Sequence, residues 1–144
     1  MSRNLSPEHP PAPPIGSRFD RGCATFEHVF GLPAKTFLDA LADVSPDFAR
    51  HVMEWEFADV YSRPALSLRE RELVVLAACA ALGATGQGPL RLHVGAALRS
   101  GLTQEAIVET FIQVGFAAGM PATLLAMQTA KDVFASMASS EPGA

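Results

Sequence analysis

The sequence contains a series of helix start signals, each followed by apolar residues at helical spacing. Ser67 is followed three residues later by Glu70, the reciprocal arrangement called a capping box. Further starts are marked by a serine cap before Pro46, by Pro89 and by a threonine cap at Thr103. Strand-like alternation never lasts long enough to compete with these patterns. The sequence therefore predicts an all-α fold.

Six helices are predicted, separated by turns in which glycine and proline recur. We expect them over residues 33–44, 45–60, 67–83, 89–101, 103–118 and 121–134. The apolar face of the second helix is expected to consist of Phe48, Val52, Trp55 and Val60. The third helix contains the apolar run LVVLAACAAL, which is too short to span a bilayer and is expected to be buried on all sides.

The length and composition predict a single domain. The chain has 144 residues, of which 49% are hydrophobic and 18% are charged, and this is enough to bury a core. We place the domain at residues 18–138, between a proline-rich disordered tail at residues 1–17 and a short disordered tail at residues 139–144.

The charge and the cysteine content of the chain bear on its expected partners and its cellular compartment. A net charge of −4 provides no basic surface for a phosphate backbone, so we expect no nucleic-acid partner. Cys23 and Cys79 lie far apart and form no CxxC pair, which suits a reducing compartment. We also expect no signal peptide and no membrane association. The predicted location is the cytoplasm.

One histidine lies on the apolar side of a predicted helix. In the segment GPLRLHVGAALRSG, His93 falls three residues after Leu90 and four before Ala97, so it shares their face. The spacing allows two interpretations: a core histidine with a hydrogen-bond partner, or a residue that lines a pocket.

The predicted helices carry more apolar surface than six short helices can hide among themselves. They are also rich in alanine and glycine, which allow helix axes to approach closely. Because large exposed apolar patches are rare on soluble monomers, we expect a homo-oligomer.

Three motifs occur in a fixed order along the chain: an Arg-Pro step before a capped helix, an L-x-x-H-x-x-x-A-L-x-x-G helix and a G-x-P turn. They lie in the segments YSRPALSLRERELVVLAACAALG, LRLHVGAALRSGLTQEAIVE and AGMPATLLAMQTAKDVF. In these motifs the chain resembles the gamma-carboxymuconolactone decarboxylase family, which includes alkylhydroperoxidase-like proteins. With RFDRG and VFG, the resemblance covers about Arg18 to Phe134. It implies the alkylhydroperoxidase-like helical fold, no metal or organic cofactor, and a trimer or hexamer.

The resemblance also implies a reaction. The decarboxylase acts on a lactone that bears a ring carboxylate and a carboxymethyl arm. Loss of CO2 sends an electron pair toward the lactone carbonyl, and protonation at the far carbon gives the enol-lactone. Such chemistry needs cations for the carboxylates, a donor for the developing oxyanion and an acid that protonates carbon. We therefore predict a cofactor-free carboxy-lyase that decarboxylates or isomerises a small carboxylated lactone or a related acid.

The resemblance favours His93 as the catalytic acid, because an imidazole titrates near neutral pH. Glu72 is the second catalytic candidate, and two interpretations stay open for it: a buried carboxylate that relays protons to His93, or a surface residue near the start of its helix. Arg63 and Arg71 are candidates for binding carboxylates, although each is also compatible with an ordinary salt bridge. Tyr61, at a position often filled by tryptophan in the family, completes the predicted substrate-binding residues.

Several positions depart from the family pattern and leave the substrate open. Pro89 stands where the decarboxylase commonly carries a glutamate, and Ala117 stands where a tyrosine often precedes the G-x-P turn. In the alkylhydroperoxidase-like relatives a glutamate passes protons to a CxxC pair, and the matching positions, about Ala84 and Gln87, hold no cysteine.

Two alternative functions follow from these departures. One is a redox protein that uses Cys79 or Cys23 as a lone peroxidatic thiol. The other is a non-catalytic oligomer that binds a small acid. No metal site is predicted, because His51 and Glu54, one helical turn apart, fall short of a ligand set.

Overall fold

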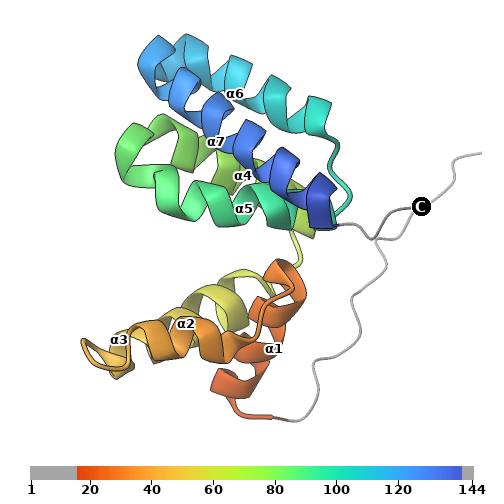
Figure 1. Cartoon of the computed structure of the whole chain (residues 1–144). Helices are drawn as coiled ribbons and strands as arrows, with labels where there is room; N and C mark the ends of the chain where they lie inside the picture. The colour runs from red at the N-terminus through yellow and green to blue at the C-terminus, as the bar shows by residue number, and fades with distance from the viewer. Residues whose placement is uncertain (1–15, 141–144) are drawn as a thin grey trace, which may run out of the picture.

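The computed structural model describes residues 16–140, in which every regular element is a helix (Figure 1). The all-α prediction is thereby confirmed. The elements in order are α1 (Arg18–Phe30), α2 (Ala34–Ala40), α3 (Pro46–His51), the π-helix η1 (Val52–Val60), α4 (Leu68–Ala81), the 3-10 helix η2 (Gly83–Gly86), α5 (Gln87–Arg99), α6 (Gln104–Ala118) and α7 (Met120–Ser140). Most of the predicted N-terminal tail and the last four residues lie outside the described residues.

The helices form two groups that follow each other along the chain (Figure 1). In the first group α1 packs along η1, with α2 and α3 beside them. Its core is largely aromatic, built on Phe26, Phe30 and Phe57. The second group is a bundle of α4, α5, α6 and α7 around an aliphatic core. Helix α5 also touches α1, so it connects the two groups.

The predicted caps are present at the helix starts. The Ser67 hydroxyl accepts from the Glu70 amide at 3.3 Å while the Glu70 carboxylate accepts from the Ser67 amide at 2.7 Å. The Thr103 hydroxyl accepts from the Ala106 amide at 3.1 Å. A second capping box, formed by Ser17 and Asp20, starts α1, a helix that is not among the six predicted ones.

The predicted second helix is divided into two elements, and its expected apolar face is wrong. Phe48 and Trp55 are 58% and 66% exposed, whereas Met53 and Phe57 are buried against α1. The expectation assumed α-helical spacing, but from Val52 the chain forms a π-helix whose hydrogen bonds span five residues rather than four. The wider turn changes which side chains of η1 share a face, which accounts for Trp55; Phe48 lies in α3, before this change begins.

The prediction that the third helix is buried on all sides is also wrong for a single chain. Leu76, Cys79 and Ala80 of α4 are buried, whereas Val74 and Leu82 are exposed. The reason is that α5, α6 and α7 cover one side of α4 and leave the other open. Within residues 16–140, no helix is both long enough and apolar enough to cross a membrane.

The close approach of α1 and η1 gives a test of the fold. A Cβ atom on Gly22 would overlap the backbone carbonyl of Met53, which has no flexible end that could move away. We expect Gly22→Ala to lower the free energy of unfolding by about 1–3 kcal/mol, the usual cost of overpacking. The matched control is Gly88→Ala in α5, where an added Cβ meets nothing within 4 Å. Equal denaturation midpoints for the two variants would contradict this packing.

Candidate active site

The centre of the candidate site is Glu72, a fully buried carboxylate in the second turn of α4. One carboxylate oxygen, Oε1, accepts a hydrogen bond from the Tyr61 hydroxyl at 3.0 Å. The other, Oε2, lies 2.8 Å from Nδ1 of His93. Burying a carboxylate is costly unless it is paired and hydrogen-bonded, and here both oxygens have partners. Of the two interpretations of Glu72, the structure shows the buried one, beside His93.

His93 lies on the buried face of α5, as its spacing predicts, and is 5% exposed. A carboxylate only accepts hydrogen bonds, so we assign the ring proton to Nδ1, which donates to Glu72. This leaves Nε2 as the nitrogen that is available to exchange a proton with another molecule. The ring packs against Phe30 in a T-shaped arrangement, with centroids 5.0 Å apart. The carboxylate and the aromatic ring together fix the orientation of the imidazole.

Tyr61 follows the last residue of η1 and reaches Glu72 from the first group of helices. Burial, followed by the negative charge of Glu72 and the hydrogen bond to it, raises the pKa of the Tyr61 phenol well above its ordinary value. The phenol therefore stays protonated and donates to Glu72. Its ring also packs against Phe57, with centroids 5.2 Å apart.

The two predicted carboxylate-binding arginines lie in different environments. Arg71 is buried, and its Nη2 donates to the backbone carbonyl of Arg63. The positive charge of Arg71 acts to lower the pKa of Tyr61, against the larger effects of burial and of Glu72. Arg63 is exposed and lies in the segment between η1 and α4. Part of the Arg71 guanidinium thus holds this segment in place next to Tyr61.

Glu56 is a half-buried carboxyl that interacts electrostatically with Glu72 and His93, and no motif or spacing in the sequence points to it. Burial raises the pKa of this carboxyl; positive charge on His93 opposes the rise, and the charge of Glu72 adds to it. Glu56 lies in η1, where its carbonyl accepts the Tyr61 amide at 2.9 Å across five residues. On an α-helix, residues five apart point in directions that differ by roughly 140°, so periodicity would have separated Glu56 from Tyr61. A sequence-based prediction would place Glu56 next to Tyr61 only if it identified this segment as a π-helix.

The cysteines and the remaining histidines lie in other environments. Burial, followed by the charges of Glu56 and Glu72, raises the pKa of the buried Cys79 thiol. Burial likewise raises the pKa of Cys23. His51 is exposed, and Glu54 pairs with Arg50 at 3.0 Å. Among residues 16–140, no group of three or more His, Cys, Asp or Glu side chains is arranged to hold a metal ion.

The arrangement is suited to proton transfer. Glu72 orients the imidazole and stabilises it when it is charged, while Nε2 is not used by the protein contacts described above. Glu56 supplies a second carboxyl whose environment favours the protonated form. A carboxyl that stays protonated to a higher pH than usual can supply a proton to its neighbours.

The raised pKa of Glu56 predicts a pH-dependent stability difference. As the pH rises above the ordinary value of 4.5, the unfolded chain ionises before the folded one, so this carboxyl lowers stability through that window. Glu56→Gln has no such titration. We expect its stability relative to the unsubstituted protein to increase above about pH 4.5 and to level off once the folded carboxyl has ionised.

The measurement is chemical denaturation across this pH range. The control is Glu109→Gln, at an exposed position of α6. A Glu56→Gln difference that stays constant with pH, or one that matches the Glu109→Gln difference, would show that Glu56 is not in the buried environment described above.

Known proteins share this sequence pattern. The profile of the carboxymuconolactone decarboxylase family matches residues 46–132. The chain is 34% identical over 97 residues to a 4-carboxymuconolactone decarboxylase of Acinetobacter baylyi (strain ATCC 33305 / BD413 / ADP1), covering 67% of this chain and 71% of that protein. It is 30% identical over 96 residues to an uncharacterized 15.0 kDa protein in the nqo9-nqo10 intergenic region of Paracoccus denitrificans, covering 67% of this chain and 72% of that protein. The matched segment contains Tyr61, Glu72 and His93, and the chain belongs to the carboxymuconolactone decarboxylase family.

Proposed function

We propose that the protein is a cofactor-free decarboxylase of a small carboxylated lactone, acting by acid–base catalysis. The observation that carries the proposal is the buried contact of 2.8 Å between Glu72 and Nδ1 of His93, which leaves Nε2 for the substrate. Family membership and the similarity to a 4-carboxymuconolactone decarboxylase support the reaction class.

In the proposed reaction the bond between the ring carbon and the departing carboxylate breaks, and CO2 leaves. The electron pair of that bond moves through the ring C=C toward the lactone carbonyl and forms a dienolate. His93, charged and held by Glu72, then donates the proton on Nε2 to the far carbon, which gives the enol-lactone. A proton from solvent restores the imidazolium. The lactone is the electron sink, so the protein supplies only orientation, charge stabilisation and the proton.

The other site residues have supporting roles in this proposal. Tyr61 fixes Glu72 through its hydroxyl and borders the site with its ring. Arg71 keeps the segment that follows Tyr61 in place, and its remaining guanidinium protons serve a substrate carboxylate. Arg63 is an exposed residue of this segment, and its charge attracts the anionic substrate.

The environment of the thiols argues against the redox alternative. A peroxidatic cysteine reacts as the thiolate, and such residues lie where positive charge lowers the thiol pKa. In this protein the pKa of Cys79 is raised by burial and by two carboxylates, and the pKa of Cys23 is raised by burial. The raised pKa values of both thiols therefore favour acid–base chemistry at His93 over thiol chemistry at either cysteine.

The first experiment measures decarboxylation of 4-carboxymuconolactone by the purified protein and by variants. Because general acid catalysis contributes about 100- to 10,000-fold, His93→Ala should lower kcat by that factor. His93→Gln, which retains a donor toward Glu72, should be equally inactive and is the second variant if alanine disturbs folding. The control is His51→Ala at an exposed histidine, which should retain full activity. Normal turnover by folded His93→Gln, or no turnover by the unsubstituted protein, would overturn the proposal.

We also propose that the chain assembles into a homo-oligomer. The support is the number of large apolar side chains that a single chain leaves exposed on the bundle helices. Phe116 of α6 is 93% exposed, and Met120 and Leu124 of α7 are exposed with it. Isolated residues of this kind are common, but so many on one small bundle are not.

Light scattering coupled to size-exclusion chromatography tests the assembly. The unsubstituted protein should elute as an oligomer, and Phe116→Glu, which places a charge on an apolar contact, should shift the population toward smaller species. Glu109→Gln, on an exposed position of the same helix, is the control. A monomer at all concentrations would contradict this proposal without affecting the assignment of His93.

A further inference from the structure

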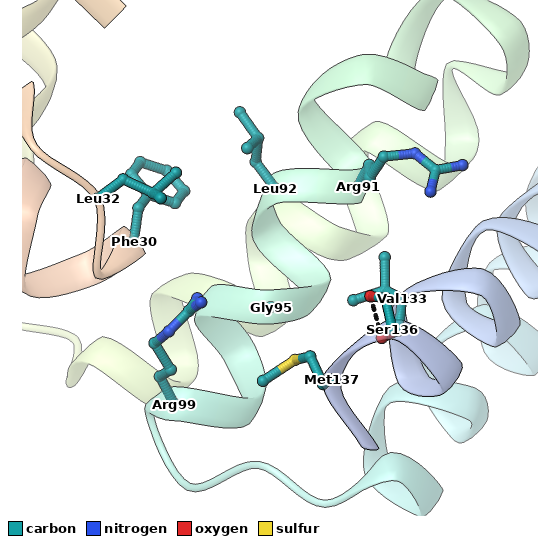
Figure 2. A pocket seen from close by; sticks show the side chains of 9 residues that line it. All are labelled: Phe30, Leu32, Arg91, Leu92, Gly95, Arg99, Val133, Ser136 and Met137. Carbon is teal, nitrogen blue, oxygen red and sulfur yellow. Dashed lines mark hydrogen bonds between the residues drawn. The ribbon is translucent and has the colours of Figure 1, made fainter. Parts of the chain in front are cut away.

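A pocket with a volume of about 210 Å³ lies between the end of α1, helix α5 and helix α7 (Figure 2). Phe30 and Leu32 form one wall, and Val133 and Met137 of α7 lie across from α5. Most of the lining is apolar. Apart from Phe30, no residue of the Glu72 and His93 site takes part in it, so the pocket is a separate feature of the molecule.

Two arginines of α5 supply the charge of this pocket, and no acidic residue lines it. Arg91 is already engaged, since it pairs with Asp132 at 3.4 Å. Arg99 forms no ion pair or side-chain hydrogen bond with any residue in the range 16–140. The Ser136 hydroxyl, which also lines the pocket, donates to the Val133 carbonyl at 2.8 Å. The guanidinium of Arg99 is therefore the polar group of the pocket that most lacks a partner.

Two glycines leave the space that the Arg99 side chain occupies. A Cβ on Gly95 would lie 3.2 Å from Nη1 of Arg99, and a Cβ on Gly31 would lie 3.0 Å from its Nε. The side chain thus runs back along α5 toward Gly95, as Figure 2 shows. The same distances place it beside Gly31. Gly31 is at the same time the left-handed residue that ends α1, with φ 63°. The absence of side chains at Gly31 and Gly95 lets the Arg99 side chain, which is exposed, lie along the edge of the pocket.

We propose that this pocket binds a small carboxylic acid with a single apolar ring, with the carboxylate on Arg99 and the ring against Phe30, Leu92 and Met137. An arginine binds a carboxylate through two parallel hydrogen bonds. A cavity of about 150 Å³ lined by apolar side chains is enough to hold benzene, so 210 Å³ accommodates one ring that carries a carboxylate. The proposal does not depend on the reaction proposed for His93.

The position of Phe30 gives the pocket a connection to His93. The Phe30 ring lines the pocket and also packs against the His93 imidazole in a T-shaped arrangement, with centroids 5.0 Å apart. A ring bound in the pocket would therefore contact the same side chain that packs against the imidazole of His93.

Benzoate and its uncharged analogue benzamide are the probes. Isothermal titration calorimetry of the full-length protein should detect benzoate binding and weaker benzamide binding. Because a hydrogen bond to a charged group contributes about 1.5–3 kcal/mol, Arg99→Gln should weaken benzoate about 10- to 100-fold. Arg69→Gln, which removes the same charge from an exposed position of α4, is the matched control and should bind like the unsubstituted protein.

A second measurement locates the ligand. In amide NMR spectra, benzoate should shift the signals of Gly31 and Gly95. Because the pocket is separate from the Glu72 and His93 pair, the shifts should be equal in the His93→Ala protein. The proposal fails if benzoate does not bind, if benzamide binds equally well, or if Arg99→Gln retains the full affinity. It also fails if the shifts are lost in His93→Ala while that variant remains folded.

Discussion

The buried carboxylate of Glu72 is the interaction on which the rest of the site depends. It accepts a hydrogen bond from the hydroxyl of Tyr61, in the first group of helices, and contacts the imidazole of His93, in the bundle. A buried acceptor that loses a partner costs about 1–3 kcal/mol, and more when it is charged. Glu72 therefore constrains the relative positions of η1, α4 and α5 as well as the tautomer of His93.

Helix α5 packs in the hydrophobic cores of both groups of helices. Leu90 and Val94 pack in the aliphatic core of the bundle, whereas Ala96 packs in the aromatic core around Phe30 and Phe57. His93 lies between Leu90 and Ala96 along the same helix, directly before Val94. The aliphatic side fixes its backbone and the aromatic side limits the rotation of its ring, which is the support that a proton-transferring side chain requires.

Local sequence signals were sufficient for several parts of the fold and of the site. The caps at Ser67 and Thr103 depend on the chemistry of one turn, and the burial of His93 follows from its spacing to Leu90 and Ala97. Spacing does not identify the partner of His93. Glu72 lies on another helix, near its start, where acidic residues are common for structural reasons alone. The family resemblance singled it out, and only tertiary packing decided between its two interpretations.

Other features were missed for reasons that can be stated physically. The π-helix changes the helical period, so α-helical spacing places the exposed Trp55 on a buried face and does not bring Glu56 close to Tyr61. Helix α1 was not predicted because its capping box at Ser17 follows a proline-rich stretch that was interpreted as tail. Arg99 carries no motif, and its significance depends on the glycines beneath it and on side chains from three separate elements.

The different sequence separations within the site also have a consequence for how the chain folds. The Glu72 and His93 pair closes a loop of 21 residues between adjacent helices, whereas the contact of Phe30 with His93 closes a loop about three times as long, which costs about 1 kcal/mol more in chain entropy. The Glu72 and His93 contact thus costs less chain entropy to form from the unfolded chain than the aromatic contact does. The aromatic contact can form only once the N-terminal helices have docked, so partial undocking of those helices would uncover the imidazole while its carboxylate partner stayed in place.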